Sequence, residues 1–355
     1  MNNLSININI ENNILDLLSV GCWGVYCNQG DYLIFKDKKG EIEQENVLRG
    51  QRIVAESLEL YTKKYPNIKD MFLAGDNVYQ VGIEKNNENT FQYNTDDLEK
   101  FLSENFGLQI KDKNSLFNIE KQISEGFEKC FEKVNIKRYF VAVGNHDIET
   151  CEILNTELKN DSWNMPNTYY NVVYNTANNI SVNCIVIDTN MFEEVPLKCD
   201  KSQYTEDEIK QQIDWIKSVS NIGSWKIVIG HIPYIANGHK KKKPFIFNNS
   251  LSQIFDIVKP QVYLCADEHN QQFLYNNDKL LSLIVCGSGG TALDSQIFDS
   301  RLPENTYTLY KNPVFGFVHL SFKDEGLLIK YINSTIQQIT FEVLINKNGN
   351  ILNLI

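Results

Sequence analysis

The sequence lacks the features that would place the protein in a membrane or on nucleic acid. No run of apolar residues reaches the roughly 18 that a transmembrane helix needs. The first basic residue is Lys36, so the chain has no basic start of the kind that signal peptides have. The net charge is −11, which disfavours a polyanion such as nucleic acid as a partner. We expect a cytoplasmic protein without a membrane span, or a secretory one if the N-terminus has been trimmed.

The chain also lacks internal repeats and any linker long enough to separate domains. Its 355 residues, 42% of them apolar, could form one large domain or two. The candidate site residues described below extend from about residue 20 to residue 270 and must converge, so we expect a single domain over residues 14–355. Residues 1–13 are polar and rich in Asn, and we expect them to be disordered.

Residues 84–116 form a polar segment rich in Asn, Asp and Lys, with scattered aromatic residues. The simplest interpretation is a surface insertion, because loops tolerate added length at a small entropic cost. The alternative interpretation is a flap that binds a partner or covers a substrate.

The eight cysteines do not form an obvious disulfide framework. Three of them, Cys184, Cys265 and Cys286, lie in apolar strand-like runs and are expected to be buried thiols. An even number of cysteines permits disulfides without showing any. We expect the thiols to be mostly free, in agreement with a reducing compartment.

Four strand-like apolar runs each end in residues that bind metals. Gly75 ends one such run, and Asp76 and Tyr79 follow it with oxygen ligands for a hard metal ion. A single Gly-Asp-Asn would be interpreted more simply as a turn, but chance would rarely repeat the pattern. The other three sets are Gly144-Asn145-His146-Asp147, Gly230-His231 and Asp267-Glu268-His269-Asn270.

The histidines follow the same distribution. Four of the five, His146, His231, His239 and His269, lie in or just after these sets, whereas His319 lies in an ordinary strand and is expected to be structural. Elsewhere the pattern predicts helices over residues 46–64 and 119–131, and a helix that begins with a capping box at Thr205. Period-2 alternation over residues 314–344 predicts antiparallel strands. The Gly-rich residues 287–290 lack the Lys of a phosphate-binding loop, so a nucleotide site is not expected.

The order of these motifs, GDNxY, GNHD, GHxP and xxHN, resembles the metallophosphoesterase (calcineurin-like) superfamily. Asp76-Asn77-Val78-Tyr79 is similar to the purple acid phosphatase branch of the small mammalian, tartrate-resistant type. The resemblance implies an α/β fold, a four-layer α/β/β/α sandwich of two mixed sheets flanked by helices. It implies hydrolysis of phosphomonoesters, from a phosphorylated small molecule or a phosphoprotein, at a dinuclear metal site. The alternatives are a catalytically impaired scaffold or anchor protein, and a phosphodiesterase.

The resemblance also implies a role for each site residue. Asp76 would bridge two metal ions of Fe, Zn or Mn, with Tyr79 and His269 at the first ion and Asn145 and His231 at the second. This chain has Cys22 where the family has Asp, and Asp267 where the family has His. Both replacements can still bind metal.

Three further residues would act on the substrate. His146 would bind phosphate or protonate the leaving alcohol, Asp147 would orient His146, and His239 would be a second substrate-facing histidine. The four lysines at 240–243 form either a solvated loop or a basic rim that attracts anionic substrates. The family's disulfide would begin near Cys199, but residues 249–251, where its partner is expected, contain no cysteine.

Overall fold

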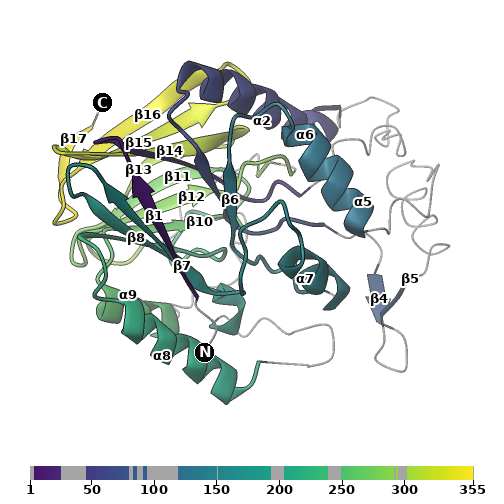
Figure 1. Cartoon of the computed structure of the whole chain (residues 1–355), viewed down its shortest axis with the longest axis horizontal. Helices are drawn as coiled ribbons and strands as arrows, with labels where there is room; N and C mark the ends of the chain where they lie inside the picture. The colour runs from purple at the N-terminus through teal and green to yellow at the C-terminus, as the bar shows by residue number, and fades with distance from the viewer. Residues whose placement is uncertain are drawn as a thin grey trace.

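The computed structural model of the protein describes residues 4–24, 45–79, 83–85, 91–93, 119–149, 151–192, 204–238, 249–291, 293–294 and 302–354. Two large β-sheets lie face to face, and helices cover the outer side of each (Figure 1). This is the four-layer α/β/β/α arrangement that the resemblance to the family implies. Among the helices in these ranges, none is both long and apolar enough to cross a membrane.

The first sheet has eight strands and is mixed. Its strands are β1 (Ser5–Ile10), β7 (Tyr170–Thr176), β8 (Ser181–Val186), β9 (Trp225–Ile229), β10 (Val262–Cys265), β11 (Gln271–Asn276), β12 (Leu281–Cys286) and β13 (Thr306–Asn312). Their order across the sheet is β1-β7-β8-β9-β10-β12-β11-β13. The central strands β8, β9, β10 and β12 are parallel. β11 pairs antiparallel with both β12 and β13, and β7 pairs antiparallel with β8.

The second sheet has seven strands and is also mixed. Its strands are β2 (Leu15–Val20), β3 (Asp70–Leu73), β6 (Arg138–Val141), β14 (Gly316–Lys323), β15 (Gly326–Asn333), β16 (Gln338–Ile345) and β17 (Ile351–Leu354). Their order is β17-β16-β15-β14-β2-β3-β6, in which β2, β3 and β6 are parallel. The C-terminal strands are antiparallel, as their period-2 pattern predicts. A separate hairpin pairs β4 (Ile83–Lys85) with β5 (Phe91–Tyr93).

Helices pack on the outer face of each sheet. They are α2 (Glu45–Lys64), α5 (Ile119–Ile123), α6 (Lys129–Phe131), α7 (Cys151–Leu158), α8 (Glu206–Val219) and α9 (Asn249–Val258). Val54 and Leu58 of α2 belong to the core around the seven-stranded sheet, whereas Ile216 of α8 and Leu251 of α9 pack under the eight-stranded sheet. Thr205 caps α8 with the predicted capping box.

Side chains of the central strands point alternately to the two faces of the sheet and so contribute to two separate apolar layers. In β8, Cys184 and Val186 face the space between the sheets, whereas Ile185 faces the helices α8 and α9. Successive side chains of a strand point to opposite faces, so a strand covered on both sides is apolar throughout. This accounts for the uninterrupted apolar runs that precede the site residues.

The helix predicted over residues 119–131 is continuous but contains one π-helical turn, Ser124–Glu128, between α5 and α6. Such a turn leaves a backbone carbonyl without its usual partner in the helix. Gln51 of α2 donates its side-chain amide to the carbonyl of Gly126 at 2.8 Å, which satisfies that acceptor.

Two expectations differ from the structure. The predicted disorder of residues 1–13 is wrong for Ser5–Ile10, which form β1 and pair in parallel with β7 along the edge of the sheet. Among the described cysteines, five are free thiols, as expected for most of them, but Cys151 is disulfide-bonded. Most of the predicted insertion 84–116 lies outside the described residues, which include only its parts in β4 and β5.

Candidate metal centre

The candidate site lies where parallel strands of both sheets end. Cys22 and Asp76 follow β2 and β3, while His231 and Asp267 follow β9 and β10. Parallel strands direct their carboxyl ends to one edge of a sheet, so residues that are distant in the chain meet there. The motif loops of the two sheets come together at this edge, as the sequence predicts.

The first cluster consists of Cys22, Asp76, Tyr79 and His269. Ligand atoms of Cys22, Asp76 and His269 all lie within 4.8 Å of one another. The Tyr79 hydroxyl donates to Oδ2 of Asp76 at 2.8 Å and lies 3.4 Å from Nε2 of His269. The backbone N–H of His269 donates to Asp294 at 2.8 Å, which fixes the loop that carries it. The cluster contains the sulfur, carboxylate, phenol and imidazole donors that a metal ion uses.

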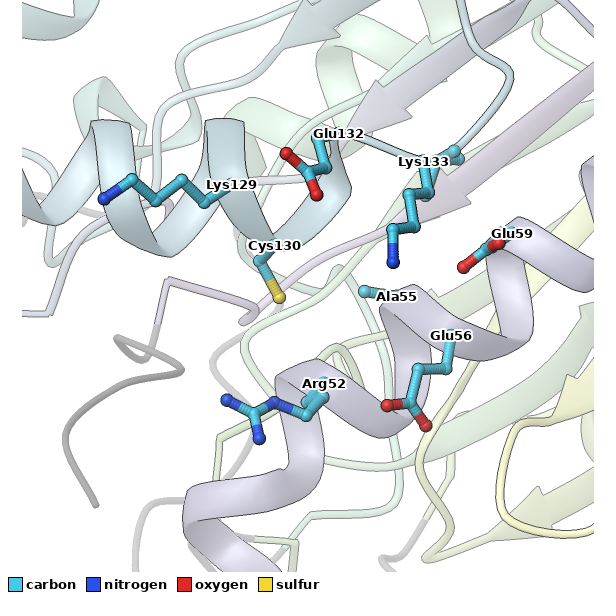
Figure 2. A pocket seen from close by; sticks show the side chains of 9 residues that line it. Arg52, Ala55, Glu56, Glu59, Lys129, Cys130, Glu132 and Lys133 are labelled. Atoms are coloured by element: carbon cyan, nitrogen blue, oxygen red, sulfur yellow. The ribbon is translucent and has the colours of Figure 1, made fainter. Parts of the chain in front are cut away.

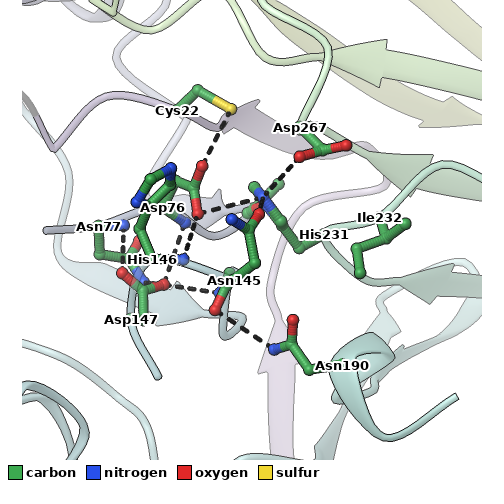
Figure 3. A network of polar contacts seen from close by, with 12 residues as sticks. Cys22, Asp76, Asn77, Asn145, His146, Asp147, Asn190, His231, Ile232 and Asp267 are labelled. Carbon is green, nitrogen blue, oxygen red and sulfur yellow. Dashed lines mark hydrogen bonds and ion pairs between the residues drawn. The ribbon is translucent and has the colours of Figure 1, made fainter. Parts of the chain in front are cut away.

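The second cluster consists of Asp76, Asn145, His231 and Asp267 (Figure 3). Nε2 of His231 lies 3.2 Å from Oδ1 of Asp76, 3.1 Å from Oδ1 of Asn145 and 3.8 Å from Oδ1 of Asp267. In the first cluster it is Oδ2 of Asp76 that contacts Tyr79 and Cys22. The two oxygens of this one carboxylate therefore face different clusters.

Three candidate ligands have a left-handed backbone. The φ angles are +53° at Cys22, +56° at Asp76 and +61° at Asp267. This conformation is uncommon for residues other than glycine, and it persists only where the surrounding structure enforces it. The N–H of Cys22 donates to the carbonyl of Gly75 at 3.0 Å, which holds two of the three turns together. The strain directs ligand side chains from separate strands toward a common point.

Two glycines leave the space that these turns require. Gly75 has a φ of +87°, and a Cβ there would lie 2.5 Å from Nδ1 of His231. A Cβ on Gly144 would lie 2.3 Å from Oδ1 of Asp76. Real Cβ atoms do not approach other atoms so closely, so the site loops can pack in this way only with glycine at both positions.

His231 is buried and held on both sides of its ring. Its Nδ1 lies 2.8 Å from the carbonyl of Ala74 on the opposite sheet, which fixes the ring and leaves Nε2 for the second cluster. Burial lowers the pKa of His231, but the Asp76 and Asp267 carboxylates outweigh burial and raise the pKa to about 9. The protonated imidazole of His231 therefore offsets the negative charge of these two carboxylates, as a bound metal cation would.

The Cys22 thiol and the Tyr79 phenol of the first cluster are neutral. Burial raises the pKa of the Cys22 thiol well above its usual value, and the Asp76 and Asp267 charges raise it further. Burial, followed by the Asp76 charge, likewise raises the pKa of the Tyr79 phenol. A metal ion would reverse both effects, because it stabilises thiolate and phenolate ligands.

His146 lies beside the clusters, and its side chain is 34% exposed. Its ring packs against that of Tyr79, with 4.5 Å between the ring centroids. Glu149, one turn further along the chain, places Oε1 3.1 Å from Nδ1 of His146. Burial lowers the pKa of His146, but Glu149 and then Asp76 outweigh it, so the pKa is raised. Glu149 is therefore the carboxylate nearest to Nδ1 of His146, and the orienting role expected of Asp147 stays a prediction.

Asp147 instead clamps two site loops together. Its carboxylate accepts hydrogen bonds from the backbone N–H groups of Asp76, Asn77, Val78 and Gly144, at 2.6–3.1 Å. It also accepts one from the Asn77 side-chain amide at 2.9 Å. Burial raises the pKa of Asp147 to about 6, and these donors keep it from rising further. We call these interactions the Asp147 clamp.

An aromatic cluster contacts the Asp147 clamp through Trp23. Trp23 packs against Phe127, Phe131 and Trp163, with ring centroids 5.2–5.9 Å apart. Its indole N–H donates to the side-chain carbonyl of Asn77 at 3.1 Å. The Trp23 side chain therefore helps to position the site loop that carries Asn77.

Other predicted features have different outcomes. His239 and the lysines 240–243 lie outside the described residues, so their roles stay predictions. The Gly-rich residues 287–290 pack closely on the site loops, and Gly289 donates its N–H to the carbonyl of Gly21 at 3.0 Å. This close packing explains the glycines at 287–290, and no bound nucleotide is needed to explain them.

Two residues near the site were missed in the sequence. The pairing of Glu149 with His146 could have been predicted from the sequence, because the two residues are three apart and their side chains can meet within one turn. Glu157 had no such signal, because it belongs to α7, where an isolated acidic residue is normally solvated. In the structure Glu157 is fully buried.

A separate hollow of about 200 Å³ lies between α2 and α6 (Figure 2). Arg52, Lys129 and Lys133 line it together with Glu56, Glu59 and Glu132, so charges of both signs are equally represented. It contains none of the residues of the two clusters. The balanced charge does not favour a phosphorylated ligand there.

Solved structures with a similar fold include proteins of different kinds. GAP50, the anchor in the inner membrane complex of Plasmodium, has a TM-score of 0.64 at 17% identity, over 94% of this chain and 89% of its own. A purple acid phosphatase from yellow lupin (Lupinus luteus) seeds has a TM-score of 0.58 at 13% identity, over 94% and 53%. PhoD has a TM-score of 0.54 at 11% identity, over 98% and 72%. At these identities the likeness shows the fold alone.

No curated protein matches the sequence. Residues 57–271, more than half of the chain, match the calcineurin-like phosphoesterase family. This range contains every candidate site residue except Cys22. The family match and the two clusters at the strand ends agree with each other, and the chain belongs to the calcineurin-like phosphoesterase family.

Proposed function

We propose that the protein is a metal-dependent phosphomonoesterase with a dinuclear centre, of the small purple acid phosphatase kind. The observation that carries this proposal is the position of Asp76, whose two oxygens face two separate sets of ligand atoms. Two cations a few ångströms apart repel each other, and a carboxylate between them offsets that repulsion. The substrate would be a phosphorylated small molecule or a phosphoprotein.

The donor atoms of the two clusters fit such a pair of metal ions. Cys22, Tyr79 and His269 would hold one ion, and Asn145, His231 and Asp267 would hold the other, with Asp76 shared. His231 lies against the Asp76 and Asp267 carboxylates, which raise its pKa, and this concentration of negative charge supports a cation in the second cluster. When bound, the ions would act as Lewis acids on the phosphoryl group.

The chain's own residues would supply the proton. Nδ1 of His146 is paired with Glu149, so its Nε2 is the atom that can donate to the oxygen of the leaving alcohol. Glu149 raises the pKa of His146, which keeps the imidazole protonated for this role. The stack on Tyr79 fixes the plane of the His146 ring.

The ligand chemistry differs between the two clusters. The Cys22 sulfur is a soft ligand, which favours zinc or ferrous iron over ferric iron in the first cluster. Asp76, Asn145 and Asp267 give the second cluster mainly hard oxygen ligands, which favours manganese. We infer a centre of Fe, Zn or Mn in which added Mn²⁺ stimulates activity more than ferric iron does.

The test is to purify the protein without chelators, determine its metal content, and measure hydrolysis of an aryl phosphate. We expect up to two metal ions per chain and hydrolysis that a chelator abolishes. A bis-aryl phosphodiester assayed in parallel distinguishes a phosphodiesterase, which would cleave the diester faster. A chain without metal and without either activity would refute the proposal.

The second candidate is a phosphatase-like scaffold with weakened catalysis. Cys22 and Asp267 favour it, because Asp267 adds a negative charge where the family has a neutral imidazole, and ligand anions offset the charge of a metal ion. The structural likeness to the anchor GAP50 is compatible with it but shows only the fold. A protein that binds metal yet hydrolyses neither ester would support this candidate.

A further inference from the structure

The turn that follows β8 contacts both loops that carry the second cluster. It consists of Asp188 and the 3-10 helix Thr189–Met191, and the side chains of Asp188, Thr189 and Asn190 are fully buried. β8 is parallel to β9, so the turn leaves the sheet at the same edge as the loop that carries His231. None of the proposed metal ligands comes from this turn.

Thr189 holds the loop that carries His231. Its hydroxyl oxygen accepts hydrogen bonds from two successive backbone N–H groups, that of His231 at 3.3 Å and that of Ile232 at 3.1 Å. A hydroxyl oxygen has two lone pairs, so it can serve both donors. The methyl group of Thr189 fills the space beside Gly230, where a Cβ would lie only 2.4 Å from Cγ2 of Thr189. Thr189 therefore contacts this loop both by hydrogen bonding and by packing.

Asn190 holds the loop that carries Asn145. Its side-chain amide donates to the carbonyl of Gly144 at 3.3 Å, and this carbonyl belongs to the peptide group that joins Gly144 to Asn145 (Figure 3). The same amide donates to Oδ1 of Asp188 at 2.9 Å, which orients it. Because Asn190 is buried, water competes little for these hydrogen bonds.

The helix α8 and the residue before it hold the turn in place. Tyr204 donates its hydroxyl to Oδ2 of Asp188 at 2.9 Å. The Gln212 side chain accepts the backbone N–H of Asp188 at 2.8 Å and donates to the backbone carbonyl of Asp188 at 3.2 Å. The turn is thus fixed by residues that belong to neither cluster, so it can act as a reference point for the two ligand loops.

We propose that Thr189 and Asn190 are positioning residues of the second cluster, which hold His231 and Asn145 at the separation that a shared metal ion requires. The two ligand side chains follow different strands, yet Nε2 of His231 lies 3.1 Å from Oδ1 of Asn145. The turn bonds to the backbone of both loops, so it fixes this separation without providing a ligand atom. The inference rests on the proposed function, because it assigns a metal ion to this cluster.

Two replacements of Thr189 separate hydrogen bonding from packing. Thr189→Val keeps both branches of the side chain but has no hydroxyl acceptor. Thr189→Ser keeps the hydroxyl but lacks the methyl group beside Gly230. If the hydrogen bonds position His231, the Ser variant should resemble the parent more closely than the Val variant does, and if packing alone matters the order should be reversed.

The chain offers matched controls for both positioning residues. Thr291 makes a comparable contact at the first cluster, because its hydroxyl donates to the carbonyl of Cys22 at 2.7 Å, so Thr291→Val makes the same change beside the other ion. Asn190→Ala removes the second contact of the turn. Its control is Asn183→Ala, because Asn183 is a buried amide of β8 that donates to the carbonyl of Val219 at 3.0 Å rather than to a site loop.

The first measurement is hydrogen exchange of the N–H groups of His231 and Ile232 in the metal-free protein. We expect exchange at least about tenfold faster in Thr189→Val, and close to the parent in Thr189→Ser and Thr291→Val. Exchange that is unchanged in Thr189→Val, or as fast in Thr189→Ser as in Thr189→Val, would overturn the role of the hydroxyl. This measurement requires neither metal nor hydrolysis, so failure of the proposed function would be seen separately.

The second measurement is titration with Co²⁺. An ion bound through the Cys22 thiolate has a sulfur-to-metal charge-transfer absorption, which distinguishes the first cluster from the second. We expect Thr189→Val and Asn190→Ala to weaken binding in the second cluster at least about tenfold while the first changes less than about threefold. Thr291→Val should weaken the first cluster instead, and Asn183→Ala should weaken neither.

The titration contradicts the proposal if Thr189→Val and Asn190→Ala leave the second cluster unchanged, or if they weaken both clusters alike. The latter result would show a general loss of stability rather than positioning of two ligands. If Thr189→Val does not fold, Asn190→Ala still decides. A parent protein that binds no Co²⁺ would refute the proposed function, and the exchange rates would then still decide whether Thr189 holds the His231 loop.

Discussion

Asp76 contacts both clusters through its two carboxylate oxygens. Its Oδ2 accepts from Tyr79, while its Oδ1 pairs with His231 and also accepts the N–H of His146 at 3.1 Å. The Asp76 side chain is buried, so solvent screens its charge only weakly and a change in that charge affects both clusters strongly. Substitution here tests the metal centre more directly than substitution of any single terminal ligand.

We expect Asp76→Asn to lose most of its bound metal and its hydrolytic activity. The amide keeps the shape of the side chain but removes the negative charge between the two sites. Metal analysis and Mn²⁺ titration of the purified variant measure the effect. Asp294→Asn is a matched control, because Asp294 holds the His269 backbone without belonging to either cluster. Full metal content in Asp76→Asn would show that the clusters are misassigned.

His146 and Glu149 make a separate prediction about turnover. His146→Ala should lower kcat by roughly 10²–10⁴-fold with metal retained, as for loss of a general acid. A general acid must be protonated, so activity is lost as the pH rises through its pKa. Glu149 raises the pKa of His146, so in Glu149→Gln the alkaline loss of activity should begin at lower pH. A pH profile of kcat in the three proteins tests this, and an unchanged profile in Glu149→Gln would argue against the pairing.

Among the larger elements, strands and helices with strong periodicity were predictable from the sequence. The helix over residues 46–64, the capping box at Thr205 and the C-terminal antiparallel strands are confirmed within a few residues. β1 was missed because its Asn-rich composition was given more weight than the alternation of Ile6, Ile8 and Ile10. Its partner β7 lies over 160 residues further on, and a pairing at that distance has no local signal.

That the strand-end residues meet was predictable from the sequence, whereas their individual contacts were not. The residues at strand ends meet because the topology of parallel strands brings them together. The roles of Asp147 and Glu149 depend on which N–H groups and rings lie nearby once the loops have folded. Sequence spacing alone does not decide between them, so the role beside His146 was expected of the adjacent Asp147, whereas Glu149 is the carboxylate nearest to Nδ1 of His146.

The turn after β3 gives an element-scale prediction. Gly75→Ala should destabilise the fold by about 1–3 kcal/mol and weaken metal binding, because a Cβ would meet the His231 ring in a backbone conformation that disfavours alanine. Gly223→Ala is the matched control: its φ of +76° is similar, but its nearest contact would be 3.1 Å and away from the site. Denaturant unfolding and metal titration should show both effects in Gly75→Ala and only a smaller loss of stability in Gly223→Ala. Equal metal affinity in the two variants would disprove the link between this turn and the site.

For the whole molecule, metal binding and folding should be coupled through pH. In the metal-free fold, the pKa of His231 is raised to about 9, and the pKa of the Cys22 thiol is raised well above its usual value. Both side chains must lose a proton to bind a metal cation. Affinity for Mn²⁺ should therefore rise with pH up to about 9, by roughly tenfold per unit for each proton displaced. Because metal binds only the folded chain, an excess of 100 times Kd should add about 2.7 kcal/mol of stability. Thermal unfolding with and without Mn²⁺ at pH 6 and pH 8 tests this, and equal stabilisation at both values would contradict it.

Whether the whole molecule is an enzyme or a scaffold depends on Cys22 and Asp267 together. The double variant Cys22→Asp with Asp267→His replaces soft sulfur by hard oxygen in the first cluster and an anion by an imidazole in the second. The site then has one negative charge fewer, so its metal ions should bind phosphate more strongly and polarise it more. We expect iron content to rise and aryl phosphate hydrolysis to increase at least about tenfold over the parent, measured on metal-reconstituted proteins side by side. Each single variant is the control for its own cluster. A parent that already has a purple iron centre and full activity would show that neither replacement weakens the site. A double variant that binds two metal ions and stays inert would show that the fold has lost catalysis elsewhere, and would favour the scaffold.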